Sequence, residues 1–440
     1  MKILYDGRIL LNILKKNSDR SGIFWVFFNL FNYLQKNKNI EISLFFENIS
    51  DYLLYLKNKE YFNTLFNNKC FNDGIFITVN INKVLKIIKI DKKLLELKNN
   101  SKFFLTKAIF SLIKSFYKKK IKNLNKKYSD FYIKNIDKIN NFDLFLSPFH
   151  AIPDFIKQNN YIKSGIVLHD TMPLNFPEYY KNFNLNDGSY YAKIINSLDK
   201  NTYCFCISEQ TKKDFLKYCG DRLDENKMFV MPIATAQDFY PDKNEEKLKK
   251  VLDKYNVSKN QRGKYIFSLC TLEPRKNLIF TIKCFIEFIK ENKIDDLYFY
   301  LGGGHWDDFI GQLEKEIYDL DKYKDKIVKL GYVDDEDVNT LYSNSLFFTY
   351  ISLYEGFGMP PLEAMSCGAP VLTSNTSSIP EVVGDAAIMI DPTDKQACIN
   401  AMKDLYFNEN LREELSKKGL EQAKKFSWDK TVDIIVKNLK

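Results

Sequence analysis

The sequence predicts an α/β protein with two doubly wound domains that face a cleft. Short apolar runs typical of buried strands alternate with longer segments typical of helices. The alternation occurs in two successive series, and a polar connection near residues 241–245 separates them. Because strands joined by helices form parallel sheets, each series predicts a sheet of its own. We therefore expect domains over 1–243 and 244–426, followed by a helix within 427–440.

The composition favours large buried cores and predicts neither export nor membrane insertion. The chain has 440 residues, 45% of them hydrophobic and 15% aromatic, which is enough for two or three domains. No apolar segment typical of a secretory signal follows Met1. No uncharged apolar run approaches the roughly 18–20 residues of a membrane span. The eight cysteines show no spacing typical of a disulfide framework or a zinc site, so we expect reduced thiols and a cytoplasmic location.

The net charge of +9 is concentrated in one segment. Residues 81–140 contain 17 lysines and 4 acidic residues, a balance of +13, so the remaining chain carries 9 − 13 = −4. Apolar residues recur among these lysines at roughly helical spacing, which predicts a basic helical insertion in the first domain. Such helices would bind an anionic membrane surface or pack as an insertion with a solvated lysine face, and the sequence leaves both roles open.

Seven apolar runs are the expected strands of the first half: 2–5, 42–46, 75–79, 143–147, 165–168, 203–207 and 228–231. Helices are expected over 24–34 and, within the basic segment, over 84–97 and 103–137. Gly22 lies in the polar loop before the first helix. Glycine would let the backbone approach a bound group there, although a plain loop glycine explains it equally well. Ser208 follows a strand and predicts a capped helix start.

The second half is a cleaner strand–helix series. The expected strands are 265–269, 297–301, 327–330, 346–350 and 370–373, and the expected helices are 278–291, 335–343, 362–367, 394–407, 411–426 and 428–439. The acidic run 334–337 fits a helix start, where the helix dipole favours negative charge. We find no set of side chains with the spacing of a metal site, so no metal is expected.

A glycine-rich loop after the strand 346–350 is the most informative stretch. Gly356, Phe357 and Gly358 form the loop, which opens a helix at the carboxyl end of a strand. Ligands of parallel sheets bind at such positions, and a helix N-terminus favours an anion. Glu355 and Glu363 bracket the loop. Taken singly, Glu363 could cap its own helix and Glu355 could be a solvated loop charge.

Arg275 and Lys276 form a second candidate site between a strand and a helix. Pro274 marks the helix start, and cations in a first helical turn oppose the dipole. Their placement is therefore typical of a site that binds an anion such as a diphosphate. The alternative is a pair of solvated charges.

The three histidines, His150, His169 and His305, are all expected at strand ends among loops. Histidine gains or loses a proton near neutral pH, so such positions suit chemistry. A structural or merely exposed side chain is the ordinary alternative.

The string from Glu355 to Glu363 resembles the E-x7-E signature of the retaining family-four glycosyltransferases, which have the GT-B fold. The string over 273–277 resembles the R-K-N motif of the same family. The resemblance implies that Glu355 contacts the donor sugar, that Glu363 contacts the nucleotide ribose, and that Arg275 and Lys276 hold the diphosphate. It also implies that His169 faces the donor sugar, that Gly22 lies beside the diphosphate, and that the helix in 427–440 crosses back to the first domain.

These expectations define two sets of site residues. The expected donor-binding residues are Gly22, Arg275, Lys276, Glu355, Gly356, Phe357, Gly358 and Glu363. The expected catalytic residues are His169, Arg275, Lys276 and Glu355.

The resemblance implies a retaining, metal-independent enzyme that moves a hexose-type sugar from a nucleotide-sugar to a glycan, a lipid-linked glycan or a protein. Synthesis of bacterial surface polysaccharide is the expected setting, with no cofactor and no nucleic-acid partner. Peripheral binding to the inner face of the membrane follows only if the basic segment binds lipid. A nucleotide-sugar epimerase and a non-catalytic partner subunit on the same fold are the alternatives. The intact set of Arg275, Lys276, Glu355 and Glu363 counts against the second.

Overall fold

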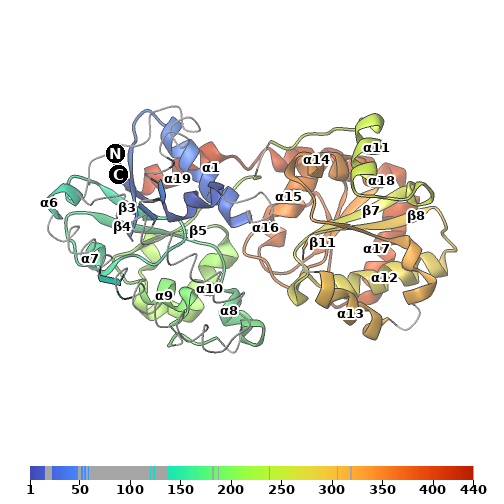
Figure 1. The fold of residues 1–440 in the computed structure, drawn as a ribbon, viewed down its shortest axis with the longest axis horizontal. Coiled ribbons are helices and arrows are strands. Elements are labelled where there is room, and N and C mark those ends of the chain that lie inside the picture. The colour runs from blue at the N-terminus through green and yellow to red at the C-terminus, as the bar shows by residue number, and fades with distance from the viewer. Residues whose placement is uncertain are drawn as a thin grey trace, which may run out of the picture. The chain divides into compact units, whose positions relative to one another are not determined.

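The computed structural model describes residues 1–14, 22–47, 136–180, 183–186, 188–236, 238–304, 306–317 and 320–439, together with isolated positions between 51 and 123. These residues form two six-stranded parallel sheets with helices around them (Figure 1). The predicted α/β class with two doubly wound sheets is therefore confirmed. The expected strand 75–79 and nearly all of the basic segment 81–140 lie outside the described residues.

The chain divides into two compact units. Unit 1 comprises the described residues of 1–167, 185–204 and 222–227, and unit 2 comprises those of 168–184, 205–221 and 228–440. The domain limits expected at 243 and 426, the cleft and the return of the last helix to the first domain stay predictions.

The first sheet has the strand order β2-β1-β3-β4-β5-β6. Its strands are β1 (Lys2–Asp6), β2 (Glu41–Phe45), β3 (Leu144–Ser147), β4 (Lys163–Leu168), β5 (Tyr203–Cys206) and β6 (Met228–Val230). Residues 3–6 of β1 and all four residues of β3 are buried. Helices on both faces bury such strands completely, and their sequences are therefore continuous apolar runs rather than alternating ones.

The helices around this sheet vary in length. They are α1 (Gly22–Lys36), α6 (Ile136–Ile139), α7 (Asp154–Lys157), α8 (Met172–Asn175), α9 (Tyr190–Asn196) and α10 (Glu209–Cys219), with 3₁₀ turns η1 (Arg8–Leu14) and η3 (Pro177–Tyr180). The predicted cap of α10 is confirmed, because the Ser208 hydroxyl accepts a hydrogen bond from the amide of Thr211 at 3.0 Å. The helices α7, α8 and α9 are not predicted, since they are too short to show a helical period.

The second sheet lies wholly in unit 2 and has the order β12-β11-β10-β7-β8-β9. Its strands are β7 (Lys264–Leu269), β8 (Leu297–Gly302), β9 (Ile327–Gly331), β10 (Phe347–Tyr350), β11 (Val371–Ser374) and β12 (Ile388–Ile390). β12 is absent from the predicted strands.

The helices of this half are α11 (Glu245–Lys254), α12 (Leu278–Glu291), α13 (Trp306–Glu316), α14 (Asp335–Asn344), α15 (Met359–Ser366), α16 (Ile379–Val383), α17 (Lys395–Phe407), α18 (Glu409–Ala423) and α19 (Trp428–Leu439). α12 packs beside α17 and α15 beside α18, and the two pairs cover opposite faces of the sheet (Figure 1). The core between sheet and helices includes Phe285, Phe299, Phe347 and Leu372. α11, α13 and α16 are not among the predicted helices.

Candidate active site

In unit 2 the expected donor-binding residues lie at the edge of the sheet where the strand order reverses. The chain winds from β7 through β8 to β9 in one direction, and β10 then pairs with the other side of β7. Ligands of open parallel sheets bind beside the carboxyl ends of the strands at such a reversal. Arg275 and Lys276 follow β7, and Glu355 follows β10. Topology alone therefore brings the predicted cations and carboxylate to one edge.

Glu355 lies at the centre of these contacts. Its Oε1 accepts hydrogen bonds from Nζ of Lys276 at 2.7 Å, from Nη1 of Arg275 at 3.0 Å and from the Tyr350 hydroxyl at 2.9 Å. Nζ of Lys276 also donates to the Tyr350 oxygen at 2.5 Å, and Nε of Arg275 donates to Glu273 at 2.8 Å. Lys276 exposes 9% of its surface and Glu355 exposes 8%. The alternatives of solvated charges at these two positions are therefore wrong.

The charges of this cluster keep Glu355 ionised. Burial by itself raises the pKa of a carboxyl, because the charged form loses its water. Here the positive charges of Lys276 and then Arg275 more than offset burial, and the pKa of Glu355 lies below its ordinary value. The carboxylate therefore stays negative at neutral pH.

The turn that carries the cations differs from the expected helix start. Pro274 begins a 3₁₀ turn that ends at Lys276, and Asn277 then takes a left-handed conformation with φ of 55°. α12 begins only after this residue. The expectation that both cations lie in the first turn of that helix is thus wrong, because Asn277 interrupts it. The turn instead directs Lys276 and Arg275 toward Glu355.

The glycine-rich loop 356–358, called the signature loop below, needs glycine at two positions. A Cβ atom on Gly356 would lie 2.2 Å from the carbonyl oxygen of His169, so only glycine allows this approach. Gly358 has a φ of 110°, and a Cβ there would lie 2.7 Å from Cδ1 of Ile379. Gly358 is the N-cap of α15, whose first residue is Met359 rather than the expected Leu362. Phe357 is buried within the same loop.

Serine and threonine hydroxyls fix the carbonyl groups of this loop. Ser378 donates to the carbonyl oxygens of Glu355 at 2.9 Å and Phe357 at 2.8 Å. Ser208 donates to the carbonyl oxygen of Gly356 at 2.7 Å. The amide of Glu355 in turn donates to Oγ of Ser377 at 2.9 Å. Ser377 has a φ of 51°, which is uncommon outside glycine and is typical of functional sites when neighbours hold it.

Glu363 lies inside α15 and does not cap it. It is the fifth residue of the helix, and the N-cap forms no side-chain hydrogen bond. Its Oε2 instead accepts a hydrogen bond from the Tyr342 hydroxyl at 3.2 Å, and the backbone of Ala236 also hydrogen-bonds to it. Burial raises the pKa of Glu363 to about 7, and among the described residues no cation offsets this effect as Lys276 does for Glu355. The surroundings of the two signature glutamates therefore shift their pKa values in opposite directions, down for Glu355 and up for Glu363.

His169 and Asp170 lie next to the signature loop. His169 is buried, and its carbonyl oxygen accepts a hydrogen bond from the Thr211 hydroxyl at 3.1 Å. Asp170 accepts from the amide of Met172 at 2.9 Å. Burial raises the pKa of Asp170 above its ordinary value, although the nearby charge of Arg275 opposes this effect. The structure thus brings the expected histidine and the signature loop together.

A second charged cluster lies in unit 1, at the reversal between β1 and β3. Asp6 ends β1 and is fully buried, and both of its oxygens accept hydrogen bonds from Arg8 at 2.5 to 3.2 Å. Arg8 also contacts Glu47, which follows β2, and Nδ1 of His150 lies 3.4 Å from Asp6. His150 packs edge-on against the ring of Tyr190. Of these residues only His150 is a candidate from the sequence, since Asp6, Glu47 and Tyr190 are distant from one another along the chain.

Burial alone would raise the pKa of Asp6, but the adjacent Arg8 guanidinium holds it well below its ordinary value. The Asp6 carboxylate therefore stays ionised at neutral pH, paired with Arg8. Gly22 belongs to the same unit and is the first residue of α1, which is compatible with its expected loop-to-helix position. His305 lies outside the described residues.

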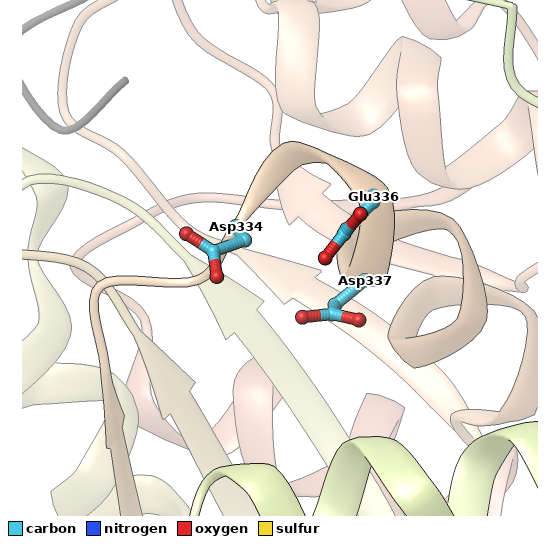
Figure 2. A group of neighbouring side chains, drawn as sticks. All are labelled: Asp334, Glu336 and Asp337. Atoms are coloured by element: carbon cyan, nitrogen blue, oxygen red, sulfur yellow. The ribbon is translucent and has the colours of Figure 1, made fainter. Parts of the chain in front are cut away.

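Three carboxylates at the start of α14 lie close enough to hold a cation, and no other such group occurs in the part of the chain that the structure describes. Figure 2 shows Asp334 before the helix and Glu336 and Asp337 in its first turn. Nζ of Lys254 lies 2.8, 3.2 and 2.6 Å from these three side chains in order. Their charge is thus met by an ammonium group of the chain itself. The predicted helix start at this acidic run is confirmed.

Comparison with known proteins finds related sequences over more than half of the chain. Residues 249–422 match the family model described as "Glycosyl transferases group 1". The chain is 33% identical over 282 residues to "O-antigen chain mannosyltransferase B" of Escherichia coli, a match that covers 63% of this chain and 70% of that protein. It is 29% identical over 280 residues to "Serotype-specific mannosyltransferase WbdA" of Escherichia coli, and there the match covers 62% of this chain and 33% of the relative.

Solved structures share the fold. The crystal structure of Anabaena Alr3699/HepE in complex with UDP and glucose superposes with a TM-score of 0.62 at 14% identity, and covers all of this chain and 99% of that one. The structure of WaaG, a glycosyltransferase involved in lipopolysaccharide biosynthesis, superposes with a TM-score of 0.52 at 14% identity, covering 70% of this chain and 81% of that one. The predicted GT-B fold is thereby confirmed.

Proposed function

Because the chain belongs to the group 1 glycosyltransferases, we propose that it transfers a mannose-type hexose from a nucleotide-sugar to a growing bacterial surface glycan. The observation that carries the choice of sugar and setting is the identity of 33% to an O-antigen mannosyltransferase over 70% of that relative. The contacts of Glu355 with Lys276 and Arg275 at the sheet reversal support the proposal that the nucleotide-sugar binds there. The chain spans only a third of WbdA, so the proposal does not include the activities of the rest of that longer protein.

The donor diphosphate would lie beside Arg275 and Lys276. Arg275 offers a planar set of N–H donors and Lys276 a compact charge, and both suit phosphate oxygens. Glu355 receives its three protein hydrogen bonds on Oε1, which leaves Oε2 for a hydroxyl of the donor sugar. Glu363 would accept from the ribose hydroxyls, since it is buried and its described partners are the Tyr342 hydroxyl and the Ala236 backbone. His169, which directly follows β4, would also face the sugar.

We propose that catalysis rests on electrostatics and positioning. Negative charge grows on the departing diphosphate as the glycosidic bond breaks. Preorganised cations stabilise that charge without reorganisation, and Lys276 and Arg275 are held in place by Glu355 before substrate arrives. The acceptor hydroxyl would attack on the face that the diphosphate leaves, and the leaving phosphate would take its proton. Anomeric configuration would be retained, and no metal ion would be needed.

The acceptor would bind to unit 1, where Arg8 and Glu47 lie at the reversal of the first sheet. The charge of Arg8 is met by Asp6 and by Glu47, so the cluster does not favour an anionic ligand. The half-exposed carboxylate of Glu47, which can accept hydroxyl hydrogens, and the partly exposed ring of Tyr190 suit a neutral sugar. Arg8→Lys should lower transfer to acceptor and leave donor hydrolysis unchanged, because a lysine cannot keep both carboxylates in place. Equal loss of both activities would argue against an acceptor role.

We also propose a cytoplasmic enzyme that reaches a lipid-linked acceptor at the membrane surface. Among the described residues, no helix is long and apolar enough to cross a membrane. Attachment would then depend on the basic segment 81–140, whose excess of +13 suits anionic lipid.

A ligand screen followed by product analysis tests the proposal. GDP-mannose, UDP-glucose, UDP-N-acetylglucosamine and the free nucleotides are added separately, and the melting temperature is recorded, since a ligand that binds only the native state raises it. The proposal expects the largest shift with GDP-mannose. Incubation with a mannose-terminated oligosaccharide should then release GDP and extend the glycan. An isomerised nucleotide-sugar would indicate an epimerase instead, and no binding to any donor would indicate a non-catalytic subunit.

A further inference from the structure

The first turn of α10 touches both sides of the donor site in unit 2. The Thr211 hydroxyl lies 3.1 Å from the carbonyl oxygen of His169 and 3.2 Å from that of Gly356. The Ser208 hydroxyl donates to the same Gly356 oxygen at 2.7 Å. The position of this helix start therefore sets the separation between His169 and the signature loop.

A carboxylate from another helix holds that start in place. Oε2 of Glu381 accepts a hydrogen bond from the amide of Glu209 at 2.7 Å, and Oε1 accepts from the amide of Gln210 at 2.8 Å. These are the first two residues of α10. Amides of a first helical turn have no partner within the helix, and the helix dipole favours a negative charge there. Glu381 of α16 thus supplies the negative charge and the hydrogen-bond acceptors that an acidic residue at the N-terminus of α10 would otherwise supply.

The helix that carries Glu381 also holds the signature loop. Ser378 is the N-cap residue of α16, and its hydroxyl donates to the carbonyl oxygens of Glu355 and Phe357. Ser378 and Glu381 are three residues apart, so one short segment holds the signature loop at one end and α10 at the other. Together with Ser208 and Thr211, which bind the carbonyl oxygen of Gly356, these contacts hold the backbone on both sides of Gly356.

We infer that Glu381 is a positioning residue for the transfer reaction, one that keeps His169 at its working distance from the signature loop by fixing the first turn of α10. The inference rests on the proposed function, in which both His169 and the loop face the donor sugar. Among the described residues Glu381 hydrogen-bonds to the amides of Glu209 and Gln210 and forms no ion pair with Arg275 or Lys276. Its loss should therefore lower kcat and leave the affinity for nucleoside diphosphate intact.

Glu381→Gln tests this with nearly the same shape. A glutamine amide can face the two N–H donors with only one oxygen, so one of the hydrogen bonds is lost. Small misplacement of a reacting group costs rate far more than binding. We expect kcat for hydrolysis of GDP-mannose to fall about tenfold, with the dissociation constant of GDP within about twofold of wild type. Hydrogen exchange of the Glu209 and Gln210 amides should become faster in the unliganded protein.

Two further variants make the test decisive. Glu209→Gln is the matched control, since it removes an exposed carboxylate from the same turn and should change neither exchange nor kcat. Thr211→Val removes the hydroxyl that binds His169 and Gly356 while the Ser208 cap remains, so it should repeat the fall in kcat even if Glu381→Gln folds poorly. Wild-type kcat in Thr211→Val, or in a folded Glu381→Gln protein, would overturn the inference. A wild-type protein that binds no nucleotide-sugar would instead overturn the proposed function on which it rests.

Discussion

The ammonium group of Lys276 lies 2.7 Å from Oε1 of Glu355, and both side chains are almost completely buried. The charge of Lys276 is balanced by Glu355, and that of Glu355 is balanced by Lys276 together with Arg275. A buried ion loses its hydration, and removing one member of such a pair leaves the other uncompensated. The pair thus links the stability of unit 2 to the residues expected to bind the diphosphate.

Lys276→Ala should affect both properties. We expect the free energy of unfolding to fall by about 3 kcal/mol, since Glu355 keeps only Arg275 and Tyr350 as partners. Turnover should fall about 100-fold or more, because a cation that stabilises the leaving group is lost, and nucleoside diphosphate should bind more weakly. Urea unfolding, calorimetric titration and a transfer assay measure the three effects.

Lys283→Ala is the control for that change, because this lysine forms an exposed ion pair with Glu316 and should cost about 1 kcal/mol at most. Nucleotide affinity and turnover equal to wild type in Lys276→Ala would exclude the diphosphate assignment.

Glu363 makes stability depend on pH in the direction opposite to Glu355. Its pKa is about 7 in the folded protein against an ordinary value of 4.5, so between these values the folded state holds a proton that the unfolded state has lost. Stability from this group is therefore largest below pH 4.5 and falls as the pH rises toward 7. We expect Glu363→Gln to be more stable than wild type at pH 8, by about 2–3 kcal/mol.

The same variant should bind its nucleotide-sugar more weakly, because the amide is a poorer acceptor for ribose hydroxyls than a carboxylate. Wild-type donor affinity should rise with pH through 7, and that of Glu363→Gln should stay flat. Melting curves and titrations at pH 5.5, 7 and 8.5 test both statements. Wild-type affinity that does not respond to pH would contradict the ribose contact.

Gly356→Ala should disrupt the contact between the signature loop and the segment of His169. The new methyl group would lie 2.2 Å from the His169 carbonyl oxygen, and overpacking against a backbone costs about 1–3 kcal/mol. Turnover should fall more than the affinity for nucleoside diphosphate. Gly311→Ala is the matched control, since a Cβ there meets no atom within 4 Å and helix propensity favours the change. Similar melting temperatures and rates for the two variants would refute the steric argument.

The basic segment 81–140 should bind anionic liposomes at low salt and release them at high salt. Each lysine near such a surface contributes at most about 1 kcal/mol, so several must act together. Replacing Lys118, Lys119, Lys120 and Lys122 with glutamine should reduce co-sedimentation and leave donor binding intact. Four changes of the same kind at Lys403, Lys417, Lys424 and Lys437 serve as the control for net charge. If the wild type ignores anionic liposomes, the segment is better interpreted as a packed insertion and the acceptor as soluble.

Much of the fold follows from the sequence, because fully buried parallel strands leave continuous apolar runs. Phe347 to Tyr350 and Leu144 to Ser147 are found in this way. Short elements escape the same reasoning. β12, over Ile388–Ile390, is only three residues long and sits among turns, and α16 shows too little of a period to be recognised.

The candidate donor residues could be named from the sequence, whereas the contacts around them could not. Glu355, Lys276 and Arg275 lie in compact motifs, so a pattern of neighbouring residues is sufficient to find them. Asp6 and His150 are separated by more than 140 positions and meet only because β1 and β3 are adjacent in the sheet. A sequence without an alignment carries no signal for such a pair.

The helix start at Pro274 shows a different limit. Proline is favoured at the first position of a helix, but it also fits a 3₁₀ turn, and the left-handed conformation of Asn277 decides between them. Asparagine tolerates that conformation better than most residues. The conformation of a single residue therefore decides whether Arg275 and Lys276, the residues expected to bind the diphosphate, lie in a helix or in a separate turn.

The hydroxyls of Ser208, Thr211 and Ser378 bind the carbonyl oxygens of Glu355, Gly356 and Phe357. Every amino acid has a carbonyl oxygen, so a replacement at Phe357 would keep these attachments. Evolution, or a laboratory library, can thus vary the side chain at position 357 and keep these backbone hydrogen bonds. The arrangement makes this scaffold a favourable starting point for selecting variants that accept a different sugar.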